Sequence, residues 1–231
     1  MTQHGLQFES LEQMAVATAR GMTEAAAQQA YGLFSDKGFR RLTLLEALSQ
    51  TEQDRIFNEL LVSGIVLVML VLEAPDLRVP REFKEHLGRV KEAVPKAHIE
   101  SLKNLGIEQE HLEVWEKLIA LRYAEYAKDK HDVRAAAMRL EAKEKPLDLS
   151  DLANIQLGLP VQTVAIGCHH HICRGETDGR DELFKLVLGS LSKFYIEIRV
   201  PLEGGRITPL ARARVALKRL VRGKRRGKRK L

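Results

Sequence analysis

The sequence LLVSGIVLVMLVL, residues 60–72, is the longest apolar run in the chain, and Glu59 and Glu73 flank it. These thirteen residues are too few for a bilayer span, which needs about 20. A helix over residues 52–73 that is apolar on every side in its second half must be enclosed by other helices or by a partner subunit. The run therefore predicts the central helix of a bundle. A homo-oligomer formed through helix 52–73 is the alternative.

The sequence on both sides of this run also has helical periodicity. The stripe from residue 112 to residue 126 repeats apolar side chains every three or four positions, and residues 1–146 contain no alternation of period two. We therefore expect residues 1–146 to form an all-helical bundle. The helices are expected at about 9–34, 41–49, 52–73, 80–94, 95–104 and 108–143.

The pattern changes in residues 147–205. A short helix is expected at 150–157. Residues 161–173 are then rich in β-branched side chains, and 194–202 alternate apolar and polar positions, both of which favour strands. A helix over 181–192 would connect them. The expected fold is therefore mainly α, with a helical bundle followed by a small α/β (strand-helix-strand) unit and a basic C-terminal helix and tail.

Metal-ligating side chains are concentrated in residues 168–173, the Cys/His tract, whose sequence is CHHHIC. On a strand, His169, His171 and Cys173 would share one face. On a helix, the useful pairs would instead be Cys168 with His171 and His169 with Cys173. Imidazole and thiolate are the ligands that zinc and iron prefer.

The loop after the tract adds oxygen ligands. The hypothesis is a transition-metal site, holding zinc or iron, that makes the chain a metal-binding protein or a metalloenzyme such as a hydrolase or oxidoreductase. Its predicted ligands are His169, His171, Cys173, Glu176 and Asp178. The alternative is a tract of core-facing and solvated side chains without a metal.

The charge of the chain is divided unevenly. Of 37 Lys and Arg residues, residues 206–231, the basic tail, contain 12 and no acidic residue, so the other 205 residues carry a net charge of −6. Residues 208–222 have the pattern of an amphipathic helix, and 223–230 are six basic residues among eight. Because such a segment repels itself, it stays extended until it meets an anion.

The expected anion is RNA or DNA, because each neutralised phosphate adds salt-dependent affinity. An acidic membrane is less favoured, because the apolar side of the 208–222 helix has no Trp or Phe. A protein partner is a further alternative. The predicted nucleic-acid contacts are Arg212, Arg214, Lys218, Arg219, Arg222, Lys224, Arg225, Arg226, Lys228, Arg229 and Lys230.

These observations predict a cytoplasmic, non-catalytic protein that associates with nucleic acid through its tail. The first twenty residues contain Glu9 and Glu12 and show no secretory or transit signal. The chain has no nucleotide-binding or hydrolase motif. Glu108 and His111 form a Glu-x-x-His pair, but the second pair of a di-iron bundle is absent from the sequence. An enzyme would therefore depend on the Cys/His tract, and a helical interaction scaffold is a further alternative.

Overall fold

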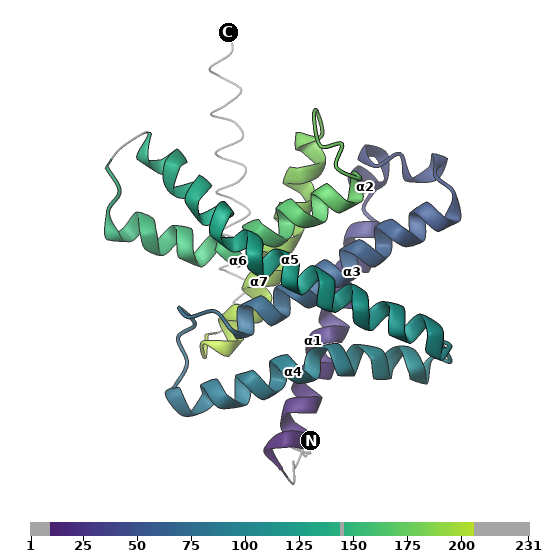
Figure 1. The fold of residues 1–231 in the computed structure, drawn as a ribbon, viewed down its shortest axis with the longest axis horizontal. Helices are drawn as coiled ribbons and strands as arrows, with labels where there is room; N and C mark the ends of the chain where they lie inside the picture. Colours follow the sequence, from purple (N-terminus) through teal and green to yellow (C-terminus); the bar gives the residue numbers. More distant parts are fainter. Residues whose placement is uncertain (1–9, 144–145, 206–231) are drawn as a thin grey trace, which may run out of the picture.

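The computed structural model describes residues 10–143 and 146–205. Over these ranges the chain forms seven α-helices and one short 3-10 helix (Figure 1). The helices are α1 (Leu11–Phe34), α2 (Lys37–Leu42), η1 (Leu45–Ala47), α3 (Gln50–Leu72), α4 (Arg81–Asn104), α5 (Gln109–Ala142), α6 (Leu149–Ile172) and α7 (Asp181–Leu202).

Helix α3 lies at the centre of the bundle. All residues from 60 to 72 are buried, and α1, α4, α5, α6 and α7 each pack against this helix. Figure 1 shows α5 crossing α3 near the middle of the molecule. The prediction of an enclosed apolar helix is confirmed, and the helices that enclose it belong to the same chain. By length and composition α3 alone among the described helices could cross a membrane, but here most of it is buried within the protein.

The helices predicted in the first 143 residues are present, with two differences. The helix expected at 41–49 is divided into α2 and η1, separated by Leu44 in the left-handed conformation. Helix α4 continues through Pro95 to Asn104 as one helix. Ser49 begins α3, because its side chain accepts a hydrogen bond from the backbone N–H of Glu52 at 3.4 Å.

The predicted strand-helix-strand unit is wrong. Residues 161–173 belong to α6 and residues 194–202 belong to α7, and the described residues contain no strand. In α7 the buried side chains follow a helical repeat. Ile196, which the alternating pattern placed with the core residues, is 47% exposed. The buried positions of this helix are Leu183, Val187, Leu191, Phe194, Tyr195, Ile198 and Arg199.

Helix α6 was the harder element to predict, because it continues through Gly158 and Pro160. Its N-terminus is fixed by a capping box in which Asp148 accepts from the backbone of Asp151 at 2.8 Å and Asp151 accepts from the backbone of Asp148 at 3.1 Å. The helix packs against α3, α5 and α7. Residues 147–205 therefore complete the core of the bundle around α3.

A glycine sets the distance between α5 and α6. A Cβ at Gly167 would overlap the aromatic ring of Tyr126, which is fully buried between the two helices. The absence of a side chain at this position is what allows α6 to approach the Tyr126 ring so closely. This close approach places the Cys/His tract, which follows directly, against the middle of α5.

Candidate functional site

The Cys/His tract forms the last turn of α6 and the residue that ends it. Successive side chains on a helix point about 100° apart, and the three histidines accordingly have different surroundings. His169 is buried and its ring lies 5.5 Å from that of Phe184 on α7. His170 is exposed. His171 faces α5, so the face shared by His169 and His171 on a strand does not exist.

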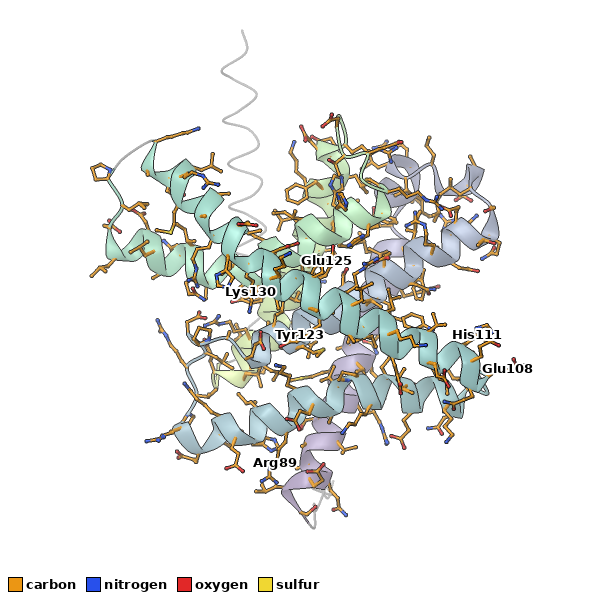
Figure 2. The ribbon with its side chains drawn as sticks, viewed as in Figure 1. Arg89, Glu108, His111, Tyr123, Glu125 and Lys130 are labelled. Carbon is orange, nitrogen blue, oxygen red and sulfur yellow. The ribbon has the colours of Figure 1, made fainter. Side chains whose placement is uncertain are left out.

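His171 is the end of a chain of polar contacts that crosses the bundle. Its Nε2 lies 2.8 Å from Glu125 Oε1 on α5, a residue labelled near the centre of Figure 2. The other oxygen of Glu125 accepts from Arg122 at 3.1 Å. Arg122 in turn donates two hydrogen bonds to Glu59 of α3, at 2.6 and 3.0 Å. The bidentate bond to Glu59 raises the pKa of Arg122.

Cys168 lies on α6 beside Ser63 of α3, near this chain of polar contacts. It has the properties of a core residue. It is fully buried, and burial raises the pKa of its thiol to about 12. The neighbouring hydroxyls of Ser63 and Tyr126 lie 3.3 Å apart, and burial also raises the pKa of Tyr126. The thiol therefore stays protonated near neutral pH. Because nucleophilic attack and metal binding both need the thiolate, this cysteine is unsuited to either role.

The second pair expected on a helix, His169 and Cys173, lies on the side of α6 that faces α7. Cys173 Sγ is 4.0 Å from a guanidinium nitrogen of Arg180. Burial raises the pKa of Cys173, although Arg180 acts in the opposite direction. Burial lowers the pKa of His169, and its Nε2 is buried without a hydrogen-bond partner. These two side chains supply two metal ligands at most.

The five predicted metal ligands are thus divided. His171 is bonded to Glu125, whereas His169 and Cys173 lie on the other side of the helix. Glu176 and Asp178 are exposed in the loop that follows. Over residues 10–143 and 146–205, no three His, Cys, Asp or Glu side chains are gathered so that they could hold an ion.

Arg55 of α3 fixes the end of α6. Its guanidinium donates to the backbone carbonyls of His171 at 2.8 Å and Ile172 at 3.1 Å. The last carbonyls of a helix have no partner within the helix and carry partial negative charge, so a guanidinium there stabilises the terminus. The orientation of the tract is therefore set by α3 as well as by α5.

A second polar cluster lies at the C-terminal end of the apolar run 60–72, and Glu73 is its centre. Glu73 accepts from Lys91 of α4 at 2.6 Å, and from Tyr123 at 2.5 Å and Lys130 at 3.0 Å on α5. Desolvation alone would raise the pKa of Glu73, but these three donors outweigh it and the pKa is lowered. Tyr123, Glu125 and Lys130 are labelled along the middle of α5 in Figure 2.

The C-terminal end of α7 is held by Arg199, which is 5% exposed. One nitrogen of its guanidinium lies 2.8 Å from Asp76 and 2.9 Å from Glu203, and another donates to the hydroxyl of Tyr195 at 2.6 Å. Tyr195 donates to the carbonyl of Leu157 on α6 at 2.7 Å. This set, the Arg199 cluster, fixes the helix end after which the basic tail begins.

The other sequence candidates lie apart from these clusters. Glu108 and His111 are exposed at the start of α5, far along the helix from Glu125 (Figure 2). The predicted nucleic-acid contacts, from Arg212 to Lys230, all lie outside the described residues.

Comparisons with family models, with curated proteins and with solved structures found no match for this chain. The functional reading therefore depends on the residues themselves. Sequence reasoning did not select Arg55, Arg122 or Arg199, each of which bonds to another element at a residue 63 to 123 positions away. The available signal was the pair of carboxylates at the two ends of the apolar run, which require cationic partners once that run is buried.

Proposed function

We propose that this protein is a non-catalytic, nucleic-acid-associated protein that binds RNA or DNA through its basic tail, residues 206–231. The observation that carries the proposal is the charge division, with twelve basic and no acidic residues in the tail and a net charge of −6 on the rest. A polyanion is attracted by the first part and repelled on average by the second. The contact is thus directed to the tail.

The Arg199 cluster supports an attachment role. Arg199 is bonded to Asp76 and Glu203, and a side-chain oxygen of Glu203 also accepts from the backbone of Arg78 at 3.2 Å. The tail therefore begins beside a helix end that is connected to α6 and to the segment after α3. Nucleic acid held by the tail would remain close to the folded body, because its point of attachment does not swing freely.

The state of the two cysteines supports a non-catalytic role. Burial raises the pKa of both Cys168 and Cys173, so the thiols stay protonated near neutral pH and are poor nucleophiles. His171 and Glu125 are bonded to each other in a contact between α5 and α6. These groups stabilise helix packing rather than face a cavity.

The test replaces the six basic residues of 223–230 by Gln in the full-length chain. Binding to fluorescently labelled 20-nucleotide RNA and DNA strands is measured by anisotropy between 50 and 200 mM salt. For single strands the salt slope falls by about 0.7 per lost phosphate contact, so a decrease of about 4 is expected. The substituted positions are Lys224, Arg225, Arg226, Lys228, Arg229 and Lys230.

The control removes charge from the body instead. Lys84, Lys103 and Lys117 are exposed on α4 and α5, and their replacement by Gln should change the affinity less than about twofold. If the tail variant binds as tightly as the original chain, the proposal is wrong. If the original chain binds anionic vesicles but neither strand, the partner of the tail is a membrane.

A metal remains a second candidate because of His169. Its Nε2 is buried without a hydrogen-bond partner, and Cys173, whose side chain is also of a type that binds zinc, follows one helical turn later. Elemental analysis of protein expressed with added zinc and iron, and purified without a nickel column, checks this. The prediction requires about one equivalent of metal that is lost in His169→Ala. Less than about a tenth of an equivalent contradicts it.

A further inference from the structure

A basic region lies on the otherwise acidic body, where the α2–η1 turn meets the α6–α7 loop. Two adjoining hollows share Arg41 and Leu44, and six basic side chains and three carboxylates line them, a net charge of +3. The hollow between the α2–η1 turn and the α6–α7 loop, of about 510 Å³, is the arginine cleft and is lined by Arg41, Arg55, Arg174 and Arg180. Its sign is opposite to that of the body as a whole.

Two of the four arginines are already used within the protein. Arg55 and Arg174 both pair with Glu52, and Arg55 also caps α6. Desolvation of Glu52 would raise its pKa, but the two arginines outweigh it and the pKa is lowered. Glu52 is therefore ionised and fully neutralised by its neighbours, and it does not occupy the other arginines.

Arg41 and Arg180 are the two arginines of the cleft without a carboxylate partner among the described residues, although Arg180 also lies 4.0 Å from Cys173 Sγ. In the part of the chain that the structure describes, neither has a carboxylate oxygen within 4.0 Å. Both are exposed, and they approach the cleft from different elements, α2 and the residue before α7. Glu176 contributes the single unpaired carboxylate of the lining. Both residues line one hollow, and a guanidinium group is the side chain best suited to bind phosphate oxygens.

Two residues that line the arginine cleft, Leu44 and Arg174, have an unusual backbone conformation. Leu44 has φ 52° and Arg174 has φ 52°, and these are the two residues other than glycine with positive φ in the described ranges. The left-handed region costs a non-glycine residue free energy and is found disproportionately at binding sites. Leu44 is also 69% exposed, so core packing gives no reason for its conformation.

We infer that the arginine cleft is a second contact for nucleic acid, in which Arg41 and Arg180 bind phosphate groups of the same strand that the basic tail holds. The inference rests on the proposed function and deepens it. The tail itself is excluded as the occupant, since it has the same sign of charge as the cleft. A polyanion is attracted to both regions, because the cleft residue Arg180 directly precedes α7 and the tail follows the end of α7 in the sequence.

The test is the double variant Arg41→Gln/Arg180→Gln in the full-length chain, assayed with the same 20-nucleotide strands. Two lost phosphate contacts lower the salt slope by about 1.4 and the affinity at 0.1 M salt by about 10- to 25-fold. The matched control is Lys103→Gln/Lys117→Gln, which removes the same charge from the α4–α5 end and should change the affinity less than about twofold.

A second double variant, Arg41→Lys/Arg180→Lys, separates a lost contact from a disturbed fold. Lysine keeps the point charge, so this variant should recover most of the salt slope that the glutamine variant loses. If the glutamine variant and the matched control bind the strands equally well, the inference is overturned.

The two proposals can fail separately. If the tail variant loses binding while the cleft variant behaves like its control, the proposed function stands and the cleft contact is wrong. If the cleft variant alone loses binding, the cleft is a contact and the tail assignment is wrong. If the cleft arginines change the binding of inorganic phosphate, measured by calorimetry, but not of either strand, the occupant is a small phosphate compound and the nucleic-acid contact is overturned.

Discussion

The crossing of α3 and α5 and the arginine cleft both contain charged side chains, but they use charge differently. At the crossing, Glu59 has two bonds from Arg122, and Glu73 has three donors. In the cleft, Arg41 and Arg180 have no ionic partner among the described residues. The first arrangement pairs its charges within the protein, whereas the second leaves two guanidinium groups without a carboxylate among the described residues.

This difference separates charges that stabilise the fold from charges that are available for binding. A buried ion whose partner is removed pays its full desolvation cost, whereas an exposed ion is solvated either way. Substitutions at the crossing should therefore change the free energy of unfolding. Substitutions in the cleft should change affinity alone, and the predictions below test this division from the largest effect to the smallest.

The largest effect is expected at Glu59, which is 6% exposed. Glu59→Ala leaves the Arg122 guanidinium buried with Glu125 as its remaining carboxylate, and removing one partner of a buried pair costs about 3–5 kcal/mol. Urea denaturation followed by circular dichroism measures the change. The double variant Glu59→Leu/Arg122→Met should recover most of the lost stability, because neither charge is then buried.

The exposed pair of Glu85 and Arg89 on α4 is the matched control. Its side chains are 79% and 44% exposed and the two groups lie 2.8 Å apart. An exposed i,i+4 pair contributes about 0.3–0.5 kcal/mol, so Glu85→Ala should be nearly silent. Equal destabilisation by Glu59→Ala and Glu85→Ala would show that burial does not distinguish the two pairs.

An intermediate effect is expected at His98, which is buried but uncharged. Burial lowers its pKa from 6.5 to about 4, and its ring lies 5.0 Å from that of Trp115. Between these two values the unfolded chain binds a proton that the folded chain does not. Stability is therefore complete above pH 6.5 and is lost as the pH falls toward 4, with about 2 kcal/mol lost between pH 7.5 and 5.

Denaturation at a series of pH values checks this prediction. In His98→Leu the stability should fall less between pH 7.5 and 5 than in the original chain, by about 2 kcal/mol. A His98→Leu profile parallel to that of the original chain would contradict the assignment.

The smallest effect on stability is expected in the cleft. Because Arg41 and Arg180 are exposed and have no ionic partner among the described residues, replacing both by Gln should change the free energy of unfolding by less than about 0.5 kcal/mol. The same variant should lose strand binding. A large loss of stability would show that these arginines stabilise the fold, as Arg122 does. It would then contradict the view that they are available to bind a strand.

The fold was predictable where the sequence carries a clear helical signal. The stripe on α5 identified a helix from its periodicity, and the apolar run of α3 identified a helix that other helices must enclose. Helix α6 is apolar on most sides and contains Pro160, so its sequence offered neither a stripe nor an uninterrupted helical segment. In α7 an alternating pattern and a helical one coexist, and packing against α6 and α3 decided between them.

The site was less predictable, because its contacts join residues distant in the sequence. The sequence of the Cys/His tract shows that residue types able to bind metals are concentrated there, but a helix turns its three histidines in different directions. Arg55 reaches the carbonyl of His171 across 116 residues, and no local pattern encodes such a contact. The count of charges along the sequence located the basic tail. It did not locate the arginine cleft, because the arginines of the cleft come from α2, α3 and the α6–α7 loop and are separated in the sequence by acidic residues.

The enclosure of α3 has a consequence for how the protein is made. A ribosome completes α3 at Leu72, whereas α7, which covers part of it, ends at Leu202, about 130 residues later. At typical rates of synthesis this delay lasts about 7 to 26 seconds. Helices α1, α4 and α5 can cover α3 before that time ends, but the sides that α6 and α7 cover stay open until those helices are made. We therefore expect nascent chains that stop before α6 to aggregate or to require a chaperone, although the finished bundle buries residues 60–72 of the same helix.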